Sequence, residues 1–471
     1  MDKKEENTGT VEKDIKDVIV IGGGAGGVPA AIRAAQLGGS VALIESENLG
    51  GFCMNRGCVP FGHMMAASNI LGNLSLGKEL GLSFTGVSKD YAALAKHQDE
   101  LIDFMRQGVK STVKKNGIDI IEGRGRIAGK GKVEVKGKTI SCKHIILATG
   151  GTWSEPDFPG ADLEEVVSTD YLLSAKELPK RLLLWGSSPW LIEIAQFLHR
   201  FGSQAILATP EKRILPAESK TIITRLTKAL KDEGIEIRTQ AELEAATKTK
   251  GGLKVKLNSI EGRETLPVDR LITLERKAAL KDLGLDTIHL DDGRGYLTVN
   301  NEMETGVDGV YAIGDLTGPP DKHYSHRASE GGIVAAENAM GKGAAVNPKT
   351  ITRVLFTQPQ VACVGLTPKE AKDEGYDTLV GAAPYSMNVY GMIISETNGI
   401  VEIVAEKEYG EILGVHFVGT GASEIAGQAV LALRMEATVE DLSSTPFPHP
   451  TLSESLAEAA RDALGKHIYL P

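Results

Sequence analysis

A glycine-rich turn between an apolar segment and an alanine-rich segment constrains the fold of this 471-residue chain more than any other feature. Residues 17–21, DVIVI, are typical of a buried strand, and the turn GGGAGG leads into VPAAIRAAQLGG, which is typical of a helix. Gly22, Gly24 and Gly27 fit the spacing G-x-G-x-x-G, whose glycines turn the chain, admit a pyrophosphate and let the helix pack on the strand. We therefore expect a dinucleotide-binding βαβ unit here.

An acidic residue completes this unit. The next strand-like segment, VALIE, ends in Glu45, which stands 23 residues after Gly22 (45 − 22). A carboxylate at about that spacing binds the ribose of a dinucleotide, and the helix N-terminus offers N–H groups to its phosphates. Strand, turn, helix and acid occur together, which makes the prediction more specific than the glycine spacing alone.

Two of the four cysteines, Cys53 and Cys58, follow closely within GGFCMNRGCVP, residues 50–60. So few cysteines do not form a disulfide scaffold, and a close pair in a reducing compartment is catalytic or metal-binding. No second pair of this kind accompanies it, which argues against metal, and Cys142 and Cys363 lie alone in apolar strand-like segments that indicate buried structural thiols. We therefore predict thiol–disulfide exchange beside a redox cofactor and no metal site.

Composition limits the partners. A chain of this length should contain about three domains, and a net charge of −10 argues against nucleic acid or an anionic membrane as the main partner. No apolar run approaches the ~18 residues of a membrane span. The charged residues 1–16 stand where a signal peptide would be apolar, so we expect a disordered tail and a cytoplasmic protein.

The cysteine segment resembles the active-site segment of the FAD-dependent pyridine nucleotide–disulfide oxidoreductases, the family that includes dihydrolipoamide dehydrogenase. The resemblance runs from about residue 16 to about residue 465 and includes IILATGG (145–151) and GVYAIGDLTG (309–318). It implies an α/β fold with two Rossmann-like βαβ domains and a C-terminal α+β dimerisation domain. The predicted division is a tail (1–16), an FAD-binding domain in two parts (17–150 and 279–346), an NAD-binding-like domain (151–278) and a dimerisation domain (347–471).

The resemblance also assigns roles to residues. It implies that Cys53 exchanges with the substrate, that Cys58 lies against the flavin as the charge-transfer thiol, and that His449 and Glu454 in HPTLSE form an acid–base pair reaching the partner's site in a homodimer. It implies bound FAD, held by the glycine turn, an acid, and residues of the two later motifs. These cofactor residues are Gly22, Gly24, Gly27, Glu45, Gly51, Thr149, Gly150, Gly314 and Asp315.

The second βαβ segment, RLLLWGSSPWLIEIAQFLHRFGSQAILAT, departs from the family pattern. Its glycine positions read Gly186, Ser188 and Leu191, and Thr209 stands where the first unit has its acid. We expect Trp190 and Leu191 to add bulk where a pyrophosphate must approach, while Ser188 and Pro189 still start a helix. Binding of NAD(P)(H) is therefore doubtful.

Two further departures lie outside that segment's glycine turn. In LITLERKAAL, Glu275 stands where relatives have glycine, and Gly62 replaces a lysine that in relatives pairs with a glutamate near the flavin. The glutamate remains as Glu193. A buried carboxylate without its cation should raise its own pKa or find another partner, for which His63 and Arg56 are candidates.

Three functions remain open. The first is a homodimeric FAD enzyme for dithiol–disulfide exchange on a lipoamide-like or other disulfide substrate, including a lipoyl-bearing protein, with a protein or small carrier as electron partner in place of NAD(P)H. The second is a conventional NAD-dependent dihydrolipoamide dehydrogenase. The third is a non-catalytic flavoprotein binding subunit, which the presence of both cysteines and the acid–base pair disfavours.

Overall fold

The computed structural model describes residues 15–273, 276–290 and 293–470. Most of the predicted tail and Glu275 lie outside the described residues. The chain forms two compact units. The first comprises Met1–Gly57, Ile102–Thr152 and Arg276–Val346, and the second comprises Cys58–Leu101, Trp153–Glu275 and Asn347–Pro471.

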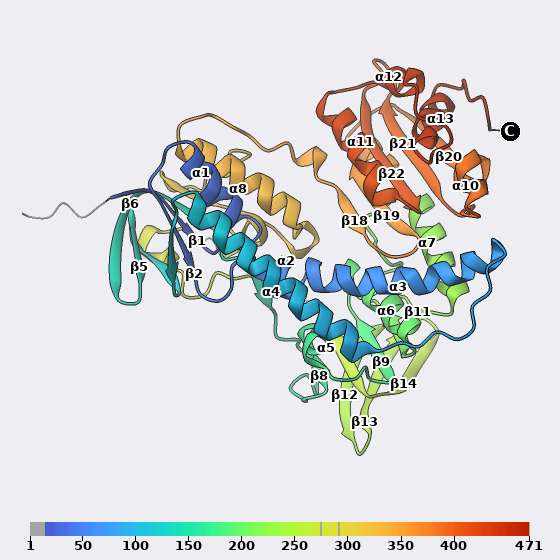
Figure 1. Cartoon of the computed structure of the whole chain (residues 1–471), viewed down its shortest axis with the longest axis horizontal. Helices are drawn as coiled ribbons and strands as arrows, with labels where there is room; N and C mark the ends of the chain where they lie inside the picture. The colour runs from blue at the N-terminus through green and yellow to red at the C-terminus, as the bar shows by residue number, and fades with distance from the viewer. Residues whose placement is uncertain (1–14, 274–275, 291–292, 471) are drawn as a thin grey trace, which may run out of the picture. The chain divides into compact units, whose positions relative to one another are not determined.

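The first unit is built on a seven-stranded sheet in the order β3-β2-β1-β6-β5-β4, with β17 also paired to β6. Figure 1 labels β1, β2, β5 and β6 of this sheet. The central pairs β1·β2, β2·β3, β1·β6 and β6·β17 are parallel. The strands are β1 (Lys16–Ile21), β2 (Val41–Glu45), β3 (Asp119–Glu122), β4 (Gly125–Gly129), β5 (Lys132–Val135), β6 (Lys138–Leu147) and β17 (Val310–Ala312). The apolar runs of β1, β2, β17 and the end of β6 are buried, as expected for parallel strands covered on both faces.

Two helices of this unit, α1 (Gly27–Gln36) and α8 (Ser325–Ala339), pack against each other because both are rich in small residues. A Cβ atom at Gly332 would lie 2.2 Å from the carbonyl oxygen of Gly26, so glycine sets the close approach of the two backbones. The other short elements are α2 (Gly51–Arg56), β16 (Arg276–Ala278), η1 (Leu285–Ile288), η2 (Gly314–Thr317) and η3 (Pro320–Lys322).

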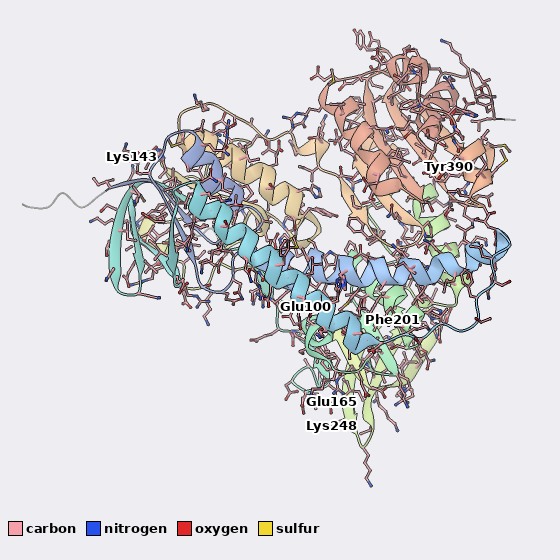
Figure 2. The ribbon with its side chains drawn as sticks, in the orientation of Figure 1. Glu100, Lys143, Glu165, Phe201, Lys248 and Tyr390 are labelled. Carbon is pink, nitrogen blue, oxygen red and sulfur yellow. The ribbon has the colours of Figure 1, made fainter. Side chains whose placement is uncertain are left out.

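In the second unit, the parallel sheet β11-β10-β9-β15-β8 forms a second Rossmann-like layer. Its elements are β8 (Val166–Val167), α5 (Asp170–Ser174), β9 (Arg181–Trp185), α6 (Pro189–Phe201), β10 (Gln204–Ala208), α7 (Lys220–Glu233), β11 (Glu236–Arg238) and β15 (Arg270–Thr273). The antiparallel strands β12 (Glu242–Thr249), β13 (Gly252–Ser259) and β14 (Gly262–Val268) form a separate sheet. An ion pair of 2.8 Å joins Lys248 of β12 to Glu165, which precedes β8 (Figure 2).

The C-terminal part of the second unit contains the antiparallel sheet β18-β19-β22-β21-β20. Its strands are β18 (Arg353–Leu355), β19 (Gln360–Gly365), β20 (Thr378–Pro384), β21 (Ile400–Glu406) and β22 (Ile412–Gly419). Helices α11 (Ala422–Arg434) and α13 (Glu454–Ala463) pack on this sheet, where alternate residues such as Val401, Val415 and Phe417 form a core. The shorter elements are η4 (Pro348–Thr350), α9 (Pro368–Asp373), η5 (Tyr385–Met387), α10 (Val389–Ile393) and α12 (Val439–Ser444).

Two long helices complete the described residues, α3 (Cys58–Glu79), whose residues all belong to the second unit, and α4 (Tyr91–Lys115). Helix α3 packs on α6 within the second unit. Among the described residues, no helix combines the length and apolar character needed to cross a membrane.

Candidate active site

The glycine turn of the first unit, residues 22–27, has almost no side chains to cover its backbone. Gly22 has φ +108°, and a Cβ atom there would lie 2.3 Å from the carbonyl oxygen of Ala148. A Cβ atom at Gly27 would lie 1.8 Å from the carbonyl oxygen of Gly22, so strand and helix approach as closely as the motif predicts. A Cβ atom at Gly24, in contrast, would meet only the Cα atom of Gly51, at 3.7 Å. Packing within the chain therefore does not require glycine at position 24, which is consistent with a glycine kept for the close approach of a ligand.

Glu45 lies beside this turn at the end of β2. Its Oε2 accepts a hydrogen bond from the Gly23 N–H at 2.7 Å, and its Oε1 accepts one from the Glu47 N–H at 2.8 Å. Gly50, just before α2, donates its N–H to the Gly23 carbonyl at 2.8 Å. The structure thus brings the acid, the glycine turn and the start of the cysteine segment together, which fits the FAD that the resemblance implies.

The residues of the later motifs belong to the same unit, and the end of β6 lies beside the glycine turn. Thr149 donates its hydroxyl to the Ala279 carbonyl at 3.1 Å, and Gly150 accepts from the Ala279 N–H at 2.9 Å. Gly314, with φ +67°, begins η2, and Asp315 follows it. Both pairs of residues come directly after neighbouring parallel strands, β6 and β17, so they share one edge of the sheet.

Arg276 is a site residue that the sequence did not reveal. Its Nη2 atom donates to Oδ2 of Asp315 at 2.8 Å, and its guanidinium lies 3.6 Å from the ring centroid of Phe52, the residue before Cys53. The resemblance drew attention to its neighbour at position 275, because glycine is expected there. In this structure Arg276 links helix α2 to the second flavin motif.

The residues between the two cysteines are also held in place. Asn55 donates its amide to the Gly51 carbonyl at 2.7 Å and accepts from Nε of Arg106 at 2.5 Å. Cys53 is half-buried in α2, and Cys58 is exposed at the first position of α3. Cys53 belongs to the first unit, whereas Cys58, His449 and Glu454 belong to the second.

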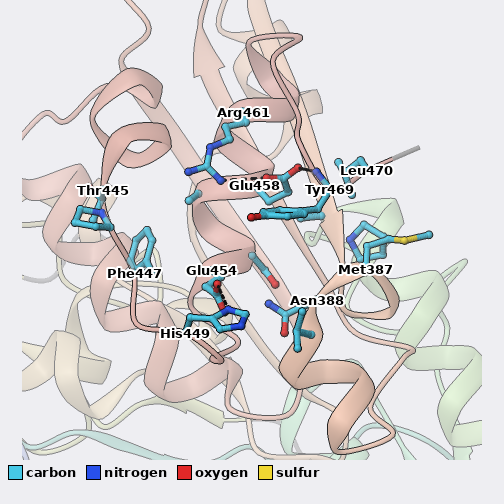
Figure 3. Close-up of a pocket in the computed structure, with 16 residues that line it drawn as sticks. Met387, Asn388, Thr445, Phe447, His449, Glu454, Glu458, Arg461, Tyr469 and Leu470 are labelled. Atoms are coloured by element: carbon cyan, nitrogen blue, oxygen red, sulfur yellow. Dashed lines mark hydrogen bonds and ion pairs between the residues drawn. The ribbon is translucent and has the colours of Figure 1, made fainter.

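His449 and Glu454 meet in the second unit, at a pocket of about 230 Å³ (Figure 3). Nδ1 of His449 lies 2.9 Å from Oε1 of Glu454, whose Oε2 accepts from the Thr451 N–H at 2.9 Å. Because Nδ1 can only donate to a carboxylate, the lone pair of the neutral imidazole lies on Nε2. The side chain of His449 is 63% exposed, so this base is available to a group outside the pocket.

The second βαβ unit keeps its fold but offers few phosphate ligands. Helix α6 begins at Pro189 after Ser188, as predicted, and Pro189 has no N–H. The Leu191 N–H already donates to the Ser188 carbonyl at 3.1 Å. Two of the first-turn donors that would bind a pyrophosphate are therefore absent or already used.

The side chains of this turn correct one expectation. Leu191 is completely buried in the core rather than projecting into the binding surface, because its position on α6 faces the sheet. Trp190 is partly buried against the same core, with its ring 6.0 Å from that of Phe61. Thr209 is buried after β10, and its hydroxyl accepts the Glu211 N–H at 3.3 Å. No carboxylate stands at that position.

Glu193 is a buried carboxyl, and its expected partners His63 and Arg56 contact other residues. Burial raises the pKa of Glu193 to about 7, while a hydrogen bond from the Phe356 N–H, at 2.8 Å, lowers it. His63 instead contacts His97, with Nε2 and Nδ1 2.8 Å apart, and Arg56 lies over the Phe52 ring. Within the second unit as described, no ion pair forms at Glu193. The expectation of a raised pKa is therefore confirmed.

We expect this raised pKa to make stability depend on pH. The unfolded carboxyl loses its proton near its ordinary pKa of 4.5, whereas the folded one keeps it up to about 7. The stabilisation is complete below the unfolded pKa and is lost as pH rises through the folded pKa, a total of about 3 kcal/mol. Glu193→Gln keeps an acceptor for Phe356 and should flatten this loss. Thermal unfolding of both proteins from about pH 5 to about pH 8 tests it, and parallel pH profiles would contradict it.

Comparison with known proteins places these residues in a family. Residues 16–343 match the model of the pyridine nucleotide-disulphide oxidoreductases, and residues 351–460 match the model of their dimerisation domain. The chain is 39% identical over 459 residues to the dihydrolipoyl dehydrogenase of Thermus scotoductus, covering 96% of this chain and 97% of that protein. It is 34% identical to the dihydrolipoyl dehydrogenase of Halobacterium salinarum, covering 96% and 97% of the two chains.

A solved structure agrees on the fold. The crystal structure of LpdA from Mycobacterium tuberculosis superposes with a TM-score of 0.85 at 24% identity, covering 94% of this chain and 98% of that chain. The two Rossmann-like layers and the C-terminal antiparallel sheet confirm the predicted α/β class. The family matches span both Rossmann-like layers and the dimerisation domain. The chain therefore belongs to the pyridine nucleotide–disulphide oxidoreductases, which are flavin-dependent disulfide oxidoreductases.

Proposed function

We propose that this protein is a homodimeric FAD enzyme that exchanges dithiols and disulfides of the lipoamide type, and that its electron partner is not a normally bound NAD(P)H. The observation that carries the second part is the turn before α6. There Pro189 lacks an N–H, the Leu191 N–H is already bonded, and Thr209 replaces the ribose-binding acid. The flavin turn has none of these changes, since Gly22, Gly24, Gly27 and Glu45 are all present.

The exchange itself requires two thiols and one base. His449 first accepts the thiol proton of Cys53, whose thiolate attacks one sulfur of the substrate disulfide; the S–S bond breaks, and the departing thiolate takes that proton back from His449. The thiolate of Cys58 then attacks the Cys53 sulfur, which forms the Cys53–Cys58 disulfide and releases the second substrate sulfur as a thiolate that takes up the proton Cys58 has lost. The protein dithiol is oxidised and the substrate disulfide is reduced, and the reverse order oxidises a dithiol substrate. Bound FAD supplies a two-electron carrier for the protein pair.

His449 suits the proton transfer. Glu454 holds its Nδ1 at 2.9 Å and so leaves Nε2 as the proton-accepting atom. The exposure of the imidazole fits a base that serves a site completed by a second subunit, and the match of residues 351–460 to the family's dimerisation domain supports that assembly. The disulfide substrate reaches Nε2 from outside the pocket in this proposal.

A conventional NAD-dependent dihydrolipoamide dehydrogenase is the second candidate. The specific observation in its favour is that the relatives named dihydrolipoyl dehydrogenase match 96% of the chain, the second βαβ unit included. The two candidates differ in nucleotide binding. Isothermal titration of the oxidised protein with NAD+, NADH and NADPH should give no saturation in the micromolar range, and micromolar saturation by any of them would favour the conventional enzyme.

Flavin binding is predicted to depend on the bare backbone at Gly24. The space around this residue accommodates a Cβ atom, so Gly24→Ala should fold, but the methyl group would occupy the approach of the pyrophosphate. We expect wild type to carry about one FAD per chain, and retention to weaken at least about tenfold in the variant. Gly108→Ala, a helical glycine of the same unit with open space around it, is the matched control. Equal flavin content in all three proteins would contradict the placement of FAD.

A further inference from the structure

Four polar residues form a row across the C-terminal sheet. Arg353 of β18 pairs in register with Cys363 of β19, Cys363 pairs with His416 of β22, and His416 pairs with Glu402 of β21. Directly opposed residues project from the same face of a sheet, with Cβ atoms about 5 Å apart. Cys363 and His416 have no exposed surface, and Glu402 is 5% exposed. Cys363 is buried in β19, as its apolar segment predicts, and the register places His416 directly opposite it.

The loop before α7 lies on this row. Glu218 accepts two hydrogen bonds from Arg353, at 2.6 and 3.0 Å, and its neighbour Ser219 donates its hydroxyl to Glu402. Glu218 is 7% exposed, and the thiol of Cys363 also interacts with its carboxylate. One ligand atom each of Glu218, Cys363 and His416 lie within 4.8 Å of one another. Each oxygen of Glu218 keeps a second lone pair beyond its bond to Arg353.

His416 is oriented as a metal ligand is. Its Nε2 donates to the Leu366 carbonyl at 2.9 Å, which fixes the tautomer and leaves a lone pair on Nδ1. Nδ1 is buried and has no hydrogen-bond partner among the described residues. A completely buried nitrogen lone pair without a donor is unfavourable, and a cation beside it would remove that cost.

The charges of the cluster match a divalent cation. To bind a cation Cys363 would give up its thiol proton, and Glu218, Glu402 and Cys363 would then carry three negative charges against the one positive charge of Arg353, which leaves two. Cation binding would release that proton to solvent.

We propose that Glu218, Cys363 and His416 bind a structural zinc ion between the α7 loop and the C-terminal sheet. Thiolate sulfur, imidazole nitrogen and carboxylate oxygen are the ligands zinc takes in proteins. One ligand comes from the loop before α7 and two come from strands of the C-terminal sheet, so the ion would hold this loop against the sheet. The site is separate from the cysteine pair of the proposed redox function and does not depend on that function.

The test measures zinc by inductively coupled plasma mass spectrometry in untagged protein. The background is the double variant Cys53→Ser/Cys58→Ser, since a reduced cysteine pair is itself a zinc site. Protein from zinc-supplemented cells, and protein refolded with ZnCl2, should each retain close to one zinc per chain after dialysis against EDTA. X-ray absorption at the zinc edge should show one sulfur neighbour at about 2.3 Å.

Variants made in the Cys53→Ser/Cys58→Ser background distinguish the loss of a zinc ligand from a general effect of substitution. Cys363→Ser and His416→Gln should each lose most of the zinc, whereas Cys142→Ser, a buried cysteine of β6 outside the cluster, should keep it. Zinc retained in both ligand variants would overturn the proposal. Because a ligand variant can fail to fold, the background protein alone also decides: no zinc after growth and after refolding overturns the site.

Discussion

Replacing Cys53 or Cys58 by serine is expected to reduce dithiol–disulfide exchange by roughly a thousandfold or more while FAD stays bound. A hydroxyl cannot form or receive a disulfide, so the first attack fails without Cys53, and without Cys58 the reaction stops at the mixed disulfide between Cys53 and the substrate. Cys53 lies within α2 and Cys58 begins α3, and both follow in the sequence the glycine turn that is proposed to bind the dinucleotide, so flavin content should not fall. The assay follows reduction of a small disulfide or lipoamide by each protein, with flavin absorbance as the measure of bound cofactor.

Cys142→Ser is the matched control for the cysteine pair. This residue is buried in β6, and burial raises its thiol pKa to about 12, so it is an inert thiol of the same unit as Cys53. Its variant should exchange at the wild-type rate. Equal rates for wild type, Cys53→Ser and Cys58→Ser would mean that the pair is structural and that the exchange mechanism is wrong.

The second large effect is a slow reaction of the bound flavin with NADH and NADPH. Loss of the ribose acid at Thr209 alone should cost only about 1–3 kcal/mol, the range of a hydrogen bond to a charged group. The helix start at α6 adds to that cost, because Pro189 has no N–H and the Leu191 N–H is bonded within the turn. Several phosphate contacts are therefore weakened together. Electrons should instead pass through a protein or another small carrier.

The parts of the fold that depend on residues close together in the sequence could be predicted from local patterns. The strand, glycine turn, helix and acid from residue 16 to Glu45 are observed in that order, because short-range sterics and short continuous apolar runs decide them. His449 and Glu454 are five residues apart and are in direct contact, because Glu454 begins α13 and only a short turn separates it from His449. The predicted five-part division of the chain and the roles of the site residues stay predictions.

Long-range register was not predictable from a single sequence. Cys363 and His416 lie in separate apolar segments, and only the pairing of β19 with β22 makes them direct neighbours. Leu191 was expected at the phosphate-binding surface, because motif spacing fixes its place in the turn but not which way its side chain points. Arg276 reaches Asp315 and Phe52 through the tertiary fold, and no local pattern joins those three positions.

Anaerobic stopped-flow reduction of the flavin by NADH and by NADPH tests the central claim most directly. Dihydrolipoamide, mixed in the same instrument, provides the positive control for a competent flavin and cysteine pair. We expect the dithiol to reduce the flavin rapidly, and both nucleotides to do so far more slowly, without saturation at micromolar concentration. Reduction by either nucleotide at about 10 per second or faster, the range of ordinary enzyme turnover, with micromolar saturation, would contradict the proposal and identify a conventional NAD(P)H-linked enzyme.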